Sequence, residues 1–465
     1  MEQTDCHSIP TEQAEIFQVK NKPVVISKTQ TVISSNAGFL VLGAIDRKMQ
    51  LIDSLLGCFQ DGQKKRLKSV SNEDRIEHSF RHLLRQRSYQ MALGYEDGLD
   101  ADELRLDPVL QLSVGKGEAL GSQPMMSRLE SWPSKSDIWR GWKELVSIYA
   151  KFFHEKGQSV VLHVDSTNDP VHGQLGMFNG YYDENCFHPL LITEEKSGFP
   201  FGIVLRNGQV GSANRVRSIL RRIIRHLKEA IPGVEIIVKG DCAFGIEDLM
   251  DELEETGVDF ILGLSGNAVL CRMVEDLKQE VLQEYEKEKK PLQRFMSLSY
   301  KAGTWTKARE VVAKVEFTEI GSPSEGVNSL GRASNAVDAK DINIRFVVSS
   351  MKSEDPETLY RSYHSRAKGI EAIIEQLKNG LRFDKTACHT KTPNQMRYFE
   401  SAIALILHLK LAQRMEKKFK ERPTIQTMIQ KVLKVAAIVR ESVRRFLIEL
   451  SSVDPHTEFL LYALQ

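Results

Sequence analysis

The spacing of apolar residues divides the chain into a helical stretch and a stretch that alternates strands with helices. Over residues 36–150 apolar side chains recur three and four positions apart, as in FLVLGAIDRKMQLIDSLLG and RIEHSFRHLLRQRSYQMALGY, which predicts a mainly helical region. Within it, LDPVLQLSVGKG predicts a short helix with Asp107 as N-cap, Pro108 in the first turn and Gly115 at its end. A second short helix is expected from Ser122, and the pair fits either a helix-turn-helix or ordinary helix packing.

Beyond Gly157 the pattern changes to short runs rich in Val, Ile and Leu, separated by amphipathic helices. SVVLHVD, HPLLIT, FGIVLRNG, VEIIVKGD and VDFILGLSG predict buried strands, and NRVRSILRRIIRHLKEA and GIEDLMDELEETG predict helices between them. This alternation is typical of the α/β class, in which helices cover the faces of a sheet. The span 268–356 becomes β-rich again around a polar loop, GSPSEGVNSLGRASNAVDA, before long helical patterns resume.

These changes predict six segments in the chain. They are a polar arm (1–35), a helical region (36–150), the first part of an α/β core (151–267), a β-rich insertion (268–356), the last core helices (357–415) and a C-terminal region (416–465). A chain of 465 residues exceeds the usual size of a single core, so two or three domains are expected. For the C-terminal region we expect a role in dimerisation or DNA contact.

The composition is that of an ordinary globular protein, with 41% hydrophobic and 27% charged residues. No run approaches the roughly 18 consecutive apolar residues that a membrane span needs. The first residues, MEQTDCHSIPTEQAEIF, are polar and acidic, so we expect no signal peptide and a cytoplasmic location. Six cysteines without a CxxC pair favour neither a zinc site nor a disulfide framework.

Positive charge is concentrated in two places, although the formal net charge is only +1. One cluster lies between residues 410 and 445. The other is a predicted helix that carries Arg215, Arg217, Arg221, Arg222 and Arg225. Acidic runs such as EDLMDELEE cancel both clusters in the sum. A solvated helix face explains such a cluster, and contact with a DNA backbone is the alternative.

Two predicted strands end in aspartate, and a later helix carries glutamates. VVLHVD stops at Asp165 and VEIIVKGD stops at Asp241, while Glu371 shares a helix face with Glu375 and Lys378. An aspartate at a strand end is by itself a common turn former. If the sheet is largely parallel, however, both aspartates lie at the carboxyl ends of its strands, where catalytic groups collect. Three carboxylates suit two Mg²⁺ or Mn²⁺ ions in phosphoryl transfer.

Several longer runs of the sequence resemble one family. They are RQRSYQMALGYEDGLDADELRLDPVLQLSVGK, LGSQPMMSRLESW, LHVDSTNDPVHGQ, GFPFGIVLRNGQVGSAN, VKGDCAFG, WTKAREVVAKVEF, RAKGIEAIIEQLKNGLRFDKTACH and PNQMRYFESAIALIL. In this order, over roughly residues 30–460, the chain resembles DDE-type transposases of bacterial insertion sequences, the transposase DDE domain group 1 family. The resemblance implies an RNase H-like core, a mixed sheet flanked by helices. A β-rich insertion would interrupt this core, and the mainly helical region would precede it and bind DNA.

The same resemblance implies roles for individual residues. Asp165, Asp241 and Glu371 would be the catalytic carboxylates and the ligands of two Mg²⁺ ions, for which Mn²⁺ would substitute. Glu375 is the alternative third acid. The residues implied in DNA binding are Tyr363, Arg366, Lys378, Lys239, Arg215, Arg217, Arg221, Arg222, Arg225 and Arg128.

The wider superfamily carries a Tyr, Arg, Glu, Lys signature on and before its last catalytic helix. The best matches here are Tyr363, Arg366, Glu371 and Lys378. Six residues separate the glutamate from the lysine, as in the pattern, whereas the interval from the arginine to the glutamate is one residue longer. In VKGDCAFG, Lys239 and Cys242 stand where an arginine and a serine are expected beside the Gly-Asp pair.

The function implied is cut-and-paste transposition at the terminal inverted repeats of the chain's own insertion sequence. Hydrolysis of a phosphodiester would free a 3′-hydroxyl, which would attack first within the end and later on target DNA. The expected partners are double-stranded DNA and a second copy of the chain, in the bacterial cytoplasm and on the nucleoid. Two rival functions stay open: a decayed or repurposed DNA-binding protein, and an RNase H-like nuclease without strand transfer.

Overall fold

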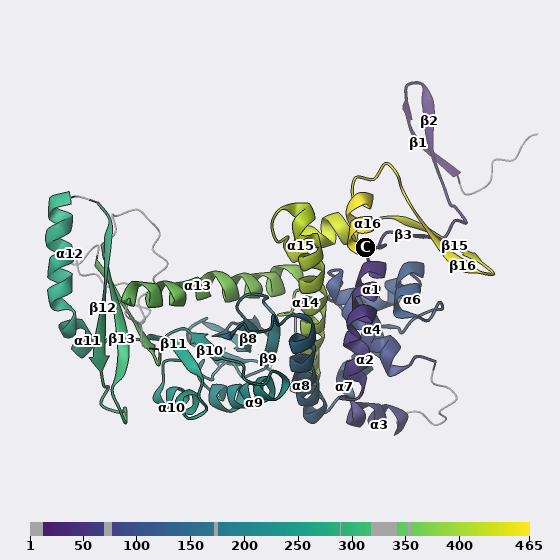
Figure 1. Ribbon diagram of the computed structural model, residues 1–465. Helices are drawn as coiled ribbons and strands as arrows, with labels where there is room; N and C mark the ends of the chain where they lie inside the picture. The colour runs from purple at the N-terminus through teal and green to yellow at the C-terminus, as the bar shows by residue number, and fades with distance from the viewer. Residues whose placement is uncertain (1–12, 69–76, 172–174, 289, 318–341, 352–354) are drawn as a thin grey trace, which may run out of the picture.

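The computed structural model describes the chain except for residues 1–12, 69–76, 172–174, 289, 318–341 and 352–354, and except for the side chains of 13–15 and 366–368. Figure 1 shows an elongated molecule with three parts in a row. A group of helices lies at one end, a large sheet occupies the middle, and a smaller unit of helices and strands lies at the far end.

The central sheet has eight strands in the order β12-β13-β14-β11-β10-β4-β8-β9. In chain order they are β4 (Val160–Ser166), β8 (Leu190–Glu194), β9 (Pro200–Val204), β10 (Ile236–Gly240), β11 (Asp259–Leu264), β12 (Leu292–Tyr300), β13 (Arg309–Phe317) and β14 (Ile342–Ser349). Only β4, β10 and β11 run parallel to one another, and every other neighbouring pair is antiparallel. The sheet is therefore mixed. Both strands that end in aspartate, β4 and β10, belong to the parallel part of the sheet. Their carboxyl ends therefore still lie at the same edge, as expected for a fully parallel sheet.

Helices cover the two faces of this sheet differently. On one face lie α9 (Val216–Ala230), which leads from β9 into β10, and α10 (Glu247–Glu255), which connects β10 to β11 (Figure 1). Their apolar side chains, such as Ile223 and Leu227, are buried against the sheet, as their helical spacing predicts. On the other face a single long helix, α13 (Pro356–Glu375), crosses the strands from the far unit toward the helical end.

The insertion differs from the expectation of β structure throughout 268–356. It begins with two helices, α11 (Ala268–Met273) and α12 (Glu275–Glu288). The Asn267 side chain caps α11 by accepting hydrogen bonds from the backbone N–H groups of Val269 and Leu270, and α12 packs Val281 inward. The strands β12 to β14 then hydrogen-bond onto β11, so they extend the core sheet rather than forming a sheet of their own. The polar loop expected after β13 lies outside the described residues.

The N-terminal region is helical, as its periodicity predicts. Its helices are α1 (Phe39–Met49), α2 (Leu51–Leu56), α3 (Gln60–Lys68), α4 (Phe80–Ala92), α5 (Asp100–Leu104), α6 (Pro108–Val114), α7 (Gln123–Ser131) and α8 (Lys135–Phe152). The predicted caps of α6 are confirmed. The Asp107 carboxylate accepts from two backbone N–H groups, Pro108 is the first helical residue, and Gly115 ends the helix with φ +94°. Ser122 precedes α7 as expected.

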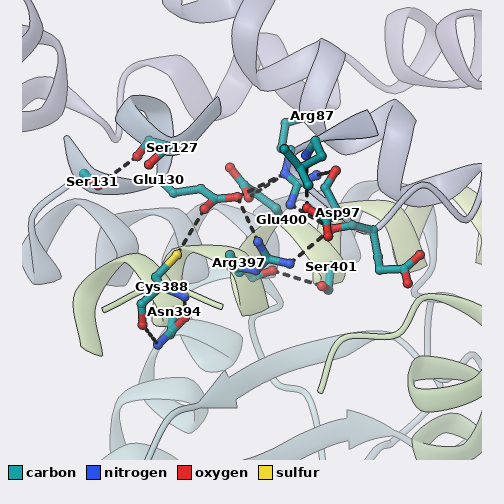
Figure 2. A network of polar contacts seen from close by, with 12 residues as sticks. Arg87, Asp97, Ser127, Glu130, Ser131, Cys388, Asn394, Arg397, Glu400 and Ser401 are labelled. Carbon is teal, nitrogen blue, oxygen red and sulfur yellow. Dashed lines mark hydrogen bonds and ion pairs between the residues drawn. The ribbon is translucent and has the colours of Figure 1, made fainter. Parts of the chain in front are cut away.

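The long helix α14 (Lys391–Phe419) joins the N-terminal helices to the core, and it is buried along most of its length. The apolar residues around it belong to one continuous cluster that extends from α1 to the sheet. Figure 2 shows buried charged groups at this junction. The Arg87 guanidinium of α4 lies 3.1 Å from the Glu130 carboxylate of α7 and 3.8 Å from that of Glu400, and Arg397 lies 3.6 Å from Glu130. The predicted DNA-binding region and the core therefore share one interior.

The two ends of the chain meet beside these helices. The arm forms a hairpin of β1 (Gln13–Val19) and β2 (Lys22–Ser27) that projects from the body. A short strand, β3 (Ile33–Ser34), pairs with β15 (Ala437–Ser442), which pairs with β16 (Arg445–Leu450). The remaining C-terminal elements are α15 (Ile425–Met428), the π-helical turn η3 (Ile429–Leu433) and α16 (Thr457–Leu464). Of the helices in the described part of the chain, none combines the length and apolar character required to cross a bilayer.

Candidate active site

Asp165 and Asp241 lie side by side at the ends of two parallel strands. The register pairs Lys239 with His163 and Gly240 with Val164, so the next residue of each strand is an aspartate. Neighbouring strands are about 4.8 Å apart, and residues in register point to the same face. Both aspartates are half-buried. The sequence prediction that these two strand ends come together is met by the strand pairing.

The chain immediately after each aspartate holds its carboxylate in place. Asp165 Oδ1 accepts a hydrogen bond from the Ser166 backbone N–H at 2.7 Å. Asp241 Oδ1 accepts from the Ala243 backbone N–H at 2.8 Å, in the turn that ends β10. Each side chain is thereby tied to its own main chain, which limits the directions in which the carboxylate can point.

Helix α13 passes over this edge of the sheet and places two signature residues there. A Cβ at Gly263 would lie only 2.7 Å from the Tyr363 hydroxyl and 2.6 Å from the Cys242 backbone nitrogen, so glycine permits this close approach. Tyr363 is therefore next to the turn that carries Asp241. Farther along, Lys378 Nζ donates to Asn168 Oδ1 at 2.7 Å, in the loop that follows Asp165.

Glu371 lies on α13 between these two residues, about two helical turns from each and about 80° round the helix axis from Tyr363. Its side chain is exposed, as is that of Glu375, which lies about 40° farther round the helix. Within the described residues, no group of three or more His, Cys, Asp or Glu side chains is gathered closely enough to hold a metal ion. The structure thus brings the two aspartates together and leaves the third carboxylate on the helix beside them.

The longer interval between Arg366 and Glu371 in the signature lies within α13. The helix is α-helical from Arg366 to Glu371, so the extra residue in that interval turns the arginine by about 100° relative to the shorter spacing. A π-helical turn, η2 (Gln376–Gly380), follows and contains Lys378. Such turns hold one extra residue and are frequent at functional sites. The side chain of Arg366 lies outside those that the structure describes.

A tyrosine that the sequence did not single out lies close to both aspartates. Tyr182 is in the turn between β6 (Met177–Asn179) and β7 (Glu184–Phe187). Burial raises the pKa of its hydroxyl to about 12, and the charges of Tyr181, Asp165 and Asp241 act in the same direction. The aromatic pair in GYYDEN was its only sequence signal, since a residue in a turn has no periodicity.

A second unforeseen residue anchors the loop after Asp165. Asp169, in β5 (Asp169–Pro170), is fully buried and accepts hydrogen bonds from Thr386 Oγ1 at 2.9 Å and from the Tyr398 hydroxyl of α14. Burial raises the pKa of this carboxyl to about 7, which the two hydrogen bonds only partly oppose. The second aspartate of DSTNDP was its signal.

The arginines of α9 lie on the opposite face of the sheet from α13 (Figure 1). Arg217 contacts Glu252 of α10 at 2.9 Å, and Arg221 forms an ion pair with the same carboxylate. The hydrogen bond from Arg221, together with that from Arg217, lowers the pKa of Glu252 to about 2 despite its burial. The Arg222 guanidinium lies 5.1 Å from the Trp139 ring centroid. Arg215, which directly precedes this helix, Arg225 on the helix, and Arg128 on α7 have exposed side chains.

Lys239 is buried rather than presented to solvent, with only 3% of its surface exposed. Its ammonium group donates to both carboxylate oxygens of Glu195, at 2.9 and 3.1 Å, and to the Ser362 carbonyl of α13 at 2.9 Å. Lysine has three N–H donors, and these bonds use all of them. The DNA contact that the family resemblance implies for Lys239 would require α13 to move.

Fold and site together define a mixed α/β protein with paired carboxylates at the ends of its central parallel strands. The family described as transposase DDE domain group 1 matches residues 17–327 and 333–465, and the chain belongs to this family. It is thus a transposase of the DDE class, and the family predicted from the sequence is confirmed.

Eight chains of solved structures match this fold. One is the piggyBac transposase synaptic complex with hairpin DNA, with a TM-score of 0.45 and 11% identity over 86% of this chain and 81% of that one. Another is the Drosophila P element transposase strand transfer complex, with a TM-score of 0.20 and 9% identity over 82% of this chain and 90% of that one. No curated protein sequence matches the chain.

Proposed function

We propose that the chain cuts and joins DNA at the terminal inverted repeats of its own bacterial insertion sequence, with Asp165, Asp241 and Glu371 as its catalytic carboxylates. The observation that carries the proposal is the register of β4 and β10, in which Asp165 and Asp241 are the next residues after the pair of Val164 and Gly240 on adjacent parallel strands, within the part of the chain that matches the transposase family.

The donor set fits a pair of hard divalent cations. Carboxylate oxygens are the ligands that Mg²⁺ prefers, and Mn²⁺ accepts the same set. Asp165 and Asp241 would hold the ions, and Glu371 would complete the set from α13. Bound there, two such ions supply charge stabilisation for an attacking and a leaving oxygen.

The remaining roles belong to side chains around this pair. In the first step water oxygen bonds to phosphorus, the bond from phosphorus to O3′ breaks, and O3′ takes up a proton to become a free hydroxyl. The oxygen of that hydroxyl then loses its proton and bonds to the phosphorus of a second phosphodiester, the bond from that phosphorus to its own O3′ breaks, and the displaced O3′ takes up a proton, so that the strands are joined. Lys378 and Tyr363 would position the phosphate, and Tyr182, whose hydroxyl is influenced by the charges of both aspartates, would contact the same group. Arg366 is proposed as a further phosphate contact from its place in the signature.

The sheet topology supports the description of the core as RNase H-like. Its first three strands, β4, β8 and β9, form an antiparallel meander. Two further strands, β10 and β11, then run parallel to β4 through helical connections, and the helix bearing Glu371 follows. The far unit (268–356) is inserted between β11 and that helix.

We further propose that the partner is double-stranded DNA and that two copies pair two ends. The N-terminal helices, including Arg128, would read the repeat, and the exposed arginines of α9 would contact DNA backbone away from the cut. A location in the bacterial cytoplasm and on the nucleoid follows from this role.

One observation favours a second candidate, a DNA-binding protein that no longer cuts. Glu371 is exposed and is not gathered with the aspartates within the described residues. A nuclease without strand transfer is the third reading, and the products of the same assay identify it, since it would hydrolyse ends without ever joining them.

The deciding experiment uses DNA that carries the gene's own flanking ends, with and without Mg²⁺. Asp165→Asn and Asp241→Asn should each lower end cleavage on the order of 10³-fold or more, with melting temperature and DNA affinity retained. The matched control is Asp276→Asn, an exposed aspartate of α12, which should cleave like the wild type. Binding without cleavage by the folded wild type would favour the non-cutting protein, and cleavage by the two variants would refute the assigned site.

A further inference from the structure

A buried charged cluster lies beneath α13, and nothing in the proposed chemistry uses it. Its members are His163 of β4, Lys239 of β10 and Glu195, which follows β8. His163 is fully buried, and Lys239 pairs with it in register. Both point to the same face as the aspartates two residues farther along their strands. The cluster therefore lies under the helix that carries Glu371.

Hydrogen bonds link this cluster to both the sheet and the helix. Glu195 accepts from Lys239 at 2.9 and 3.1 Å, and its Oε1 lies 3.3 Å from His163 Nε2. Two serines of α13 also bond to the cluster. Ser365 Oγ donates to Glu195 at 3.0 Å, and the Ser362 carbonyl accepts from Lys239 at 2.9 Å. One turn of α13 is thus bonded to β10 and to the residue that follows β8.

A glycine lets the next turn of the helix approach closely. A Cβ at Gly369 would lie 2.9 Å from His163 Cε1 and 3.1 Å from its Nδ1. Ser362, Ser365 and Gly369 are spaced three and four residues apart, so they form one strip on the helix. Glu371 lies roughly 160° round the axis from Gly369. The strip thus meets the cluster on one side of the helix, and Glu371 lies on the other.

We propose that Lys239, Glu195 and His163 are positioning residues that hold α13 at one rotation and one height over β4 and β10. They thereby set where Glu371 stands relative to Asp165 and Asp241. This inference rests on the proposed function. The physical reason is that apolar packing alone tolerates small slides of a helix, whereas a buried ammonium bonded to a half-buried carboxylate and to the helix itself favours one arrangement.

The test begins with Lys239→Met, which keeps the apolar stem and removes the three hydrogen bonds. A misplacement of about 1 Å in a catalytic group costs on the order of 10²-fold in rate, so end cleavage should fall about 30- to 100-fold. Affinity for repeat-end DNA without metal, and its salt dependence, should stay within about twofold of the wild type, since the amine is buried and fully engaged. Mn²⁺ titration of the protein–DNA complex, followed by electron paramagnetic resonance, should show binding weakened about tenfold.

A double variant of Lys239 and Glu195 distinguishes a positioning role from a general loss of structure. Glu195→Gln should give a defect similar to that of Lys239→Met, and the double variant should be no worse than either alone, because both changes break one unit. The matched control is Lys196→Met. This lysine neighbours Glu195 in sequence but forms an exposed pair with Glu155 at 2.8 Å, so its cleavage rate should not change.

Two milder variants keep the test decisive if Lys239→Met does not fold. Ser365→Ala removes one hydrogen bond and should lower cleavage about threefold to tenfold. Gly369→Ala forces α13 and His163 apart and should reproduce the cleavage defect with every charge intact. Wild-type cleavage in folded Lys239→Met, or in both milder variants, would overturn the proposal.

Two further results would also overturn it. Additive defects in the double variant would show independent roles for the two residues. A loss of DNA affinity in Lys239→Met, with a salt slope lower by about one, would assign Lys239 to a phosphate contact. A failure of the proposed function gives a different result. In that case Asp165→Asn would retain both cleavage and Mn²⁺ binding in the same assays.

Discussion

The two faces of the central sheet place their charged groups in opposite ways. On the α13 face, Asp165 and Asp241 end their strands together, and the helix above them is held by buried polar bonds. On the α9 face, a helix with four arginines lies beside the acidic helix α10, and Arg217 and Arg221 share the carboxylate of Glu252. The face that is basic in sequence is thus partly neutralised in space, and the carboxylates stand on the other.

This difference shows what a charge count can and cannot indicate. A run of arginines predicts a DNA contact only if its charges remain available, and pairing with a buried acid removes some of them. A lone aspartate at a strand end carries little information. It becomes a candidate ligand when the neighbouring parallel strand supplies a second aspartate in register.

The largest difference between the two faces is expected for a change on α13. Glu371→Gln should lower end cleavage about 100-fold, because an amide is a poorer ligand for a divalent cation than a carboxylate is. Glu375→Gln, one turn on and farther from the Tyr363 side, is the matched control and should change cleavage less than about twofold. A reversed pattern in a cleavage time course would transfer the third role to Glu375.

A smaller effect concerns stability beside the site. With the pKa of Asp169 raised to about 7, the folded chain keeps this proton between about pH 4 and 7 while the unfolded chain loses it. Stability should therefore fall as pH rises through this window. Asp169→Asn resembles the protonated form and retains an acceptor for Tyr398. Its melting temperature should vary less with pH and exceed that of the wild type at pH 8, and an unchanged slope would contradict the assignment.

The opposite sign is expected on the α9 face. The pKa of Glu252 is lowered to about 2, so its ion pairs contribute stability above about pH 4.5 that is lost as pH falls toward 2. Glu252→Gln should lower the melting temperature at pH 7 and reduce its dependence on pH below 4.5. Thermal unfolding from pH 2.5 to 7 measures both. Equal acid sensitivity in wild type and variant would show that this face gains nothing from the pairing.

The smallest effect concerns the arginines of α9 that Glu252 does not hold. Replacing Arg222 and Arg225 together by glutamine should weaken DNA binding about threefold at moderate salt and lower the salt slope by up to about two. Arg272→Gln, an exposed arginine of α11, serves as control. Titration of labelled repeat DNA at several salt concentrations measures both values, and no change would remove α9 from the DNA interface.

Much of the fold follows from local sequence, because local pattern determines local structure. The buried strands around Asp165 and Asp241 and the caps of α6 form where apolar spacing and Asp-Pro-Gly chemistry predict them. The adjacency of the two aspartates was also predictable, since both end strands of one sheet. The start of the insertion was mistaken for β structure, although the Asn267 cap was readable in the sequence.

The rest depends on contacts between distant parts of the chain. Alternation along β10 places Lys239 on the same face as Asp241, but the helix that covers this face comes more than 100 residues later. Nothing local distinguishes a buried lysine there from one that faces solvent. Tyr182 lies in a turn and Asp169 meets α14, so no periodic pattern marks either residue.

The junction of Arg87 with Arg397 and Glu400 has a consequence for how the protein is made. A ribosome that adds about 5–20 residues per second completes α14 roughly 15–60 s after α4. Until then α4 and α7 lack the helix against which they pack, and the pair of Arg87 and Glu130 lacks its contacts with Glu400 and Arg397. The N-terminal helices therefore reach their final packing only late in synthesis, and a truncated product would expose apolar surface instead of folding into a separate DNA-binding fragment.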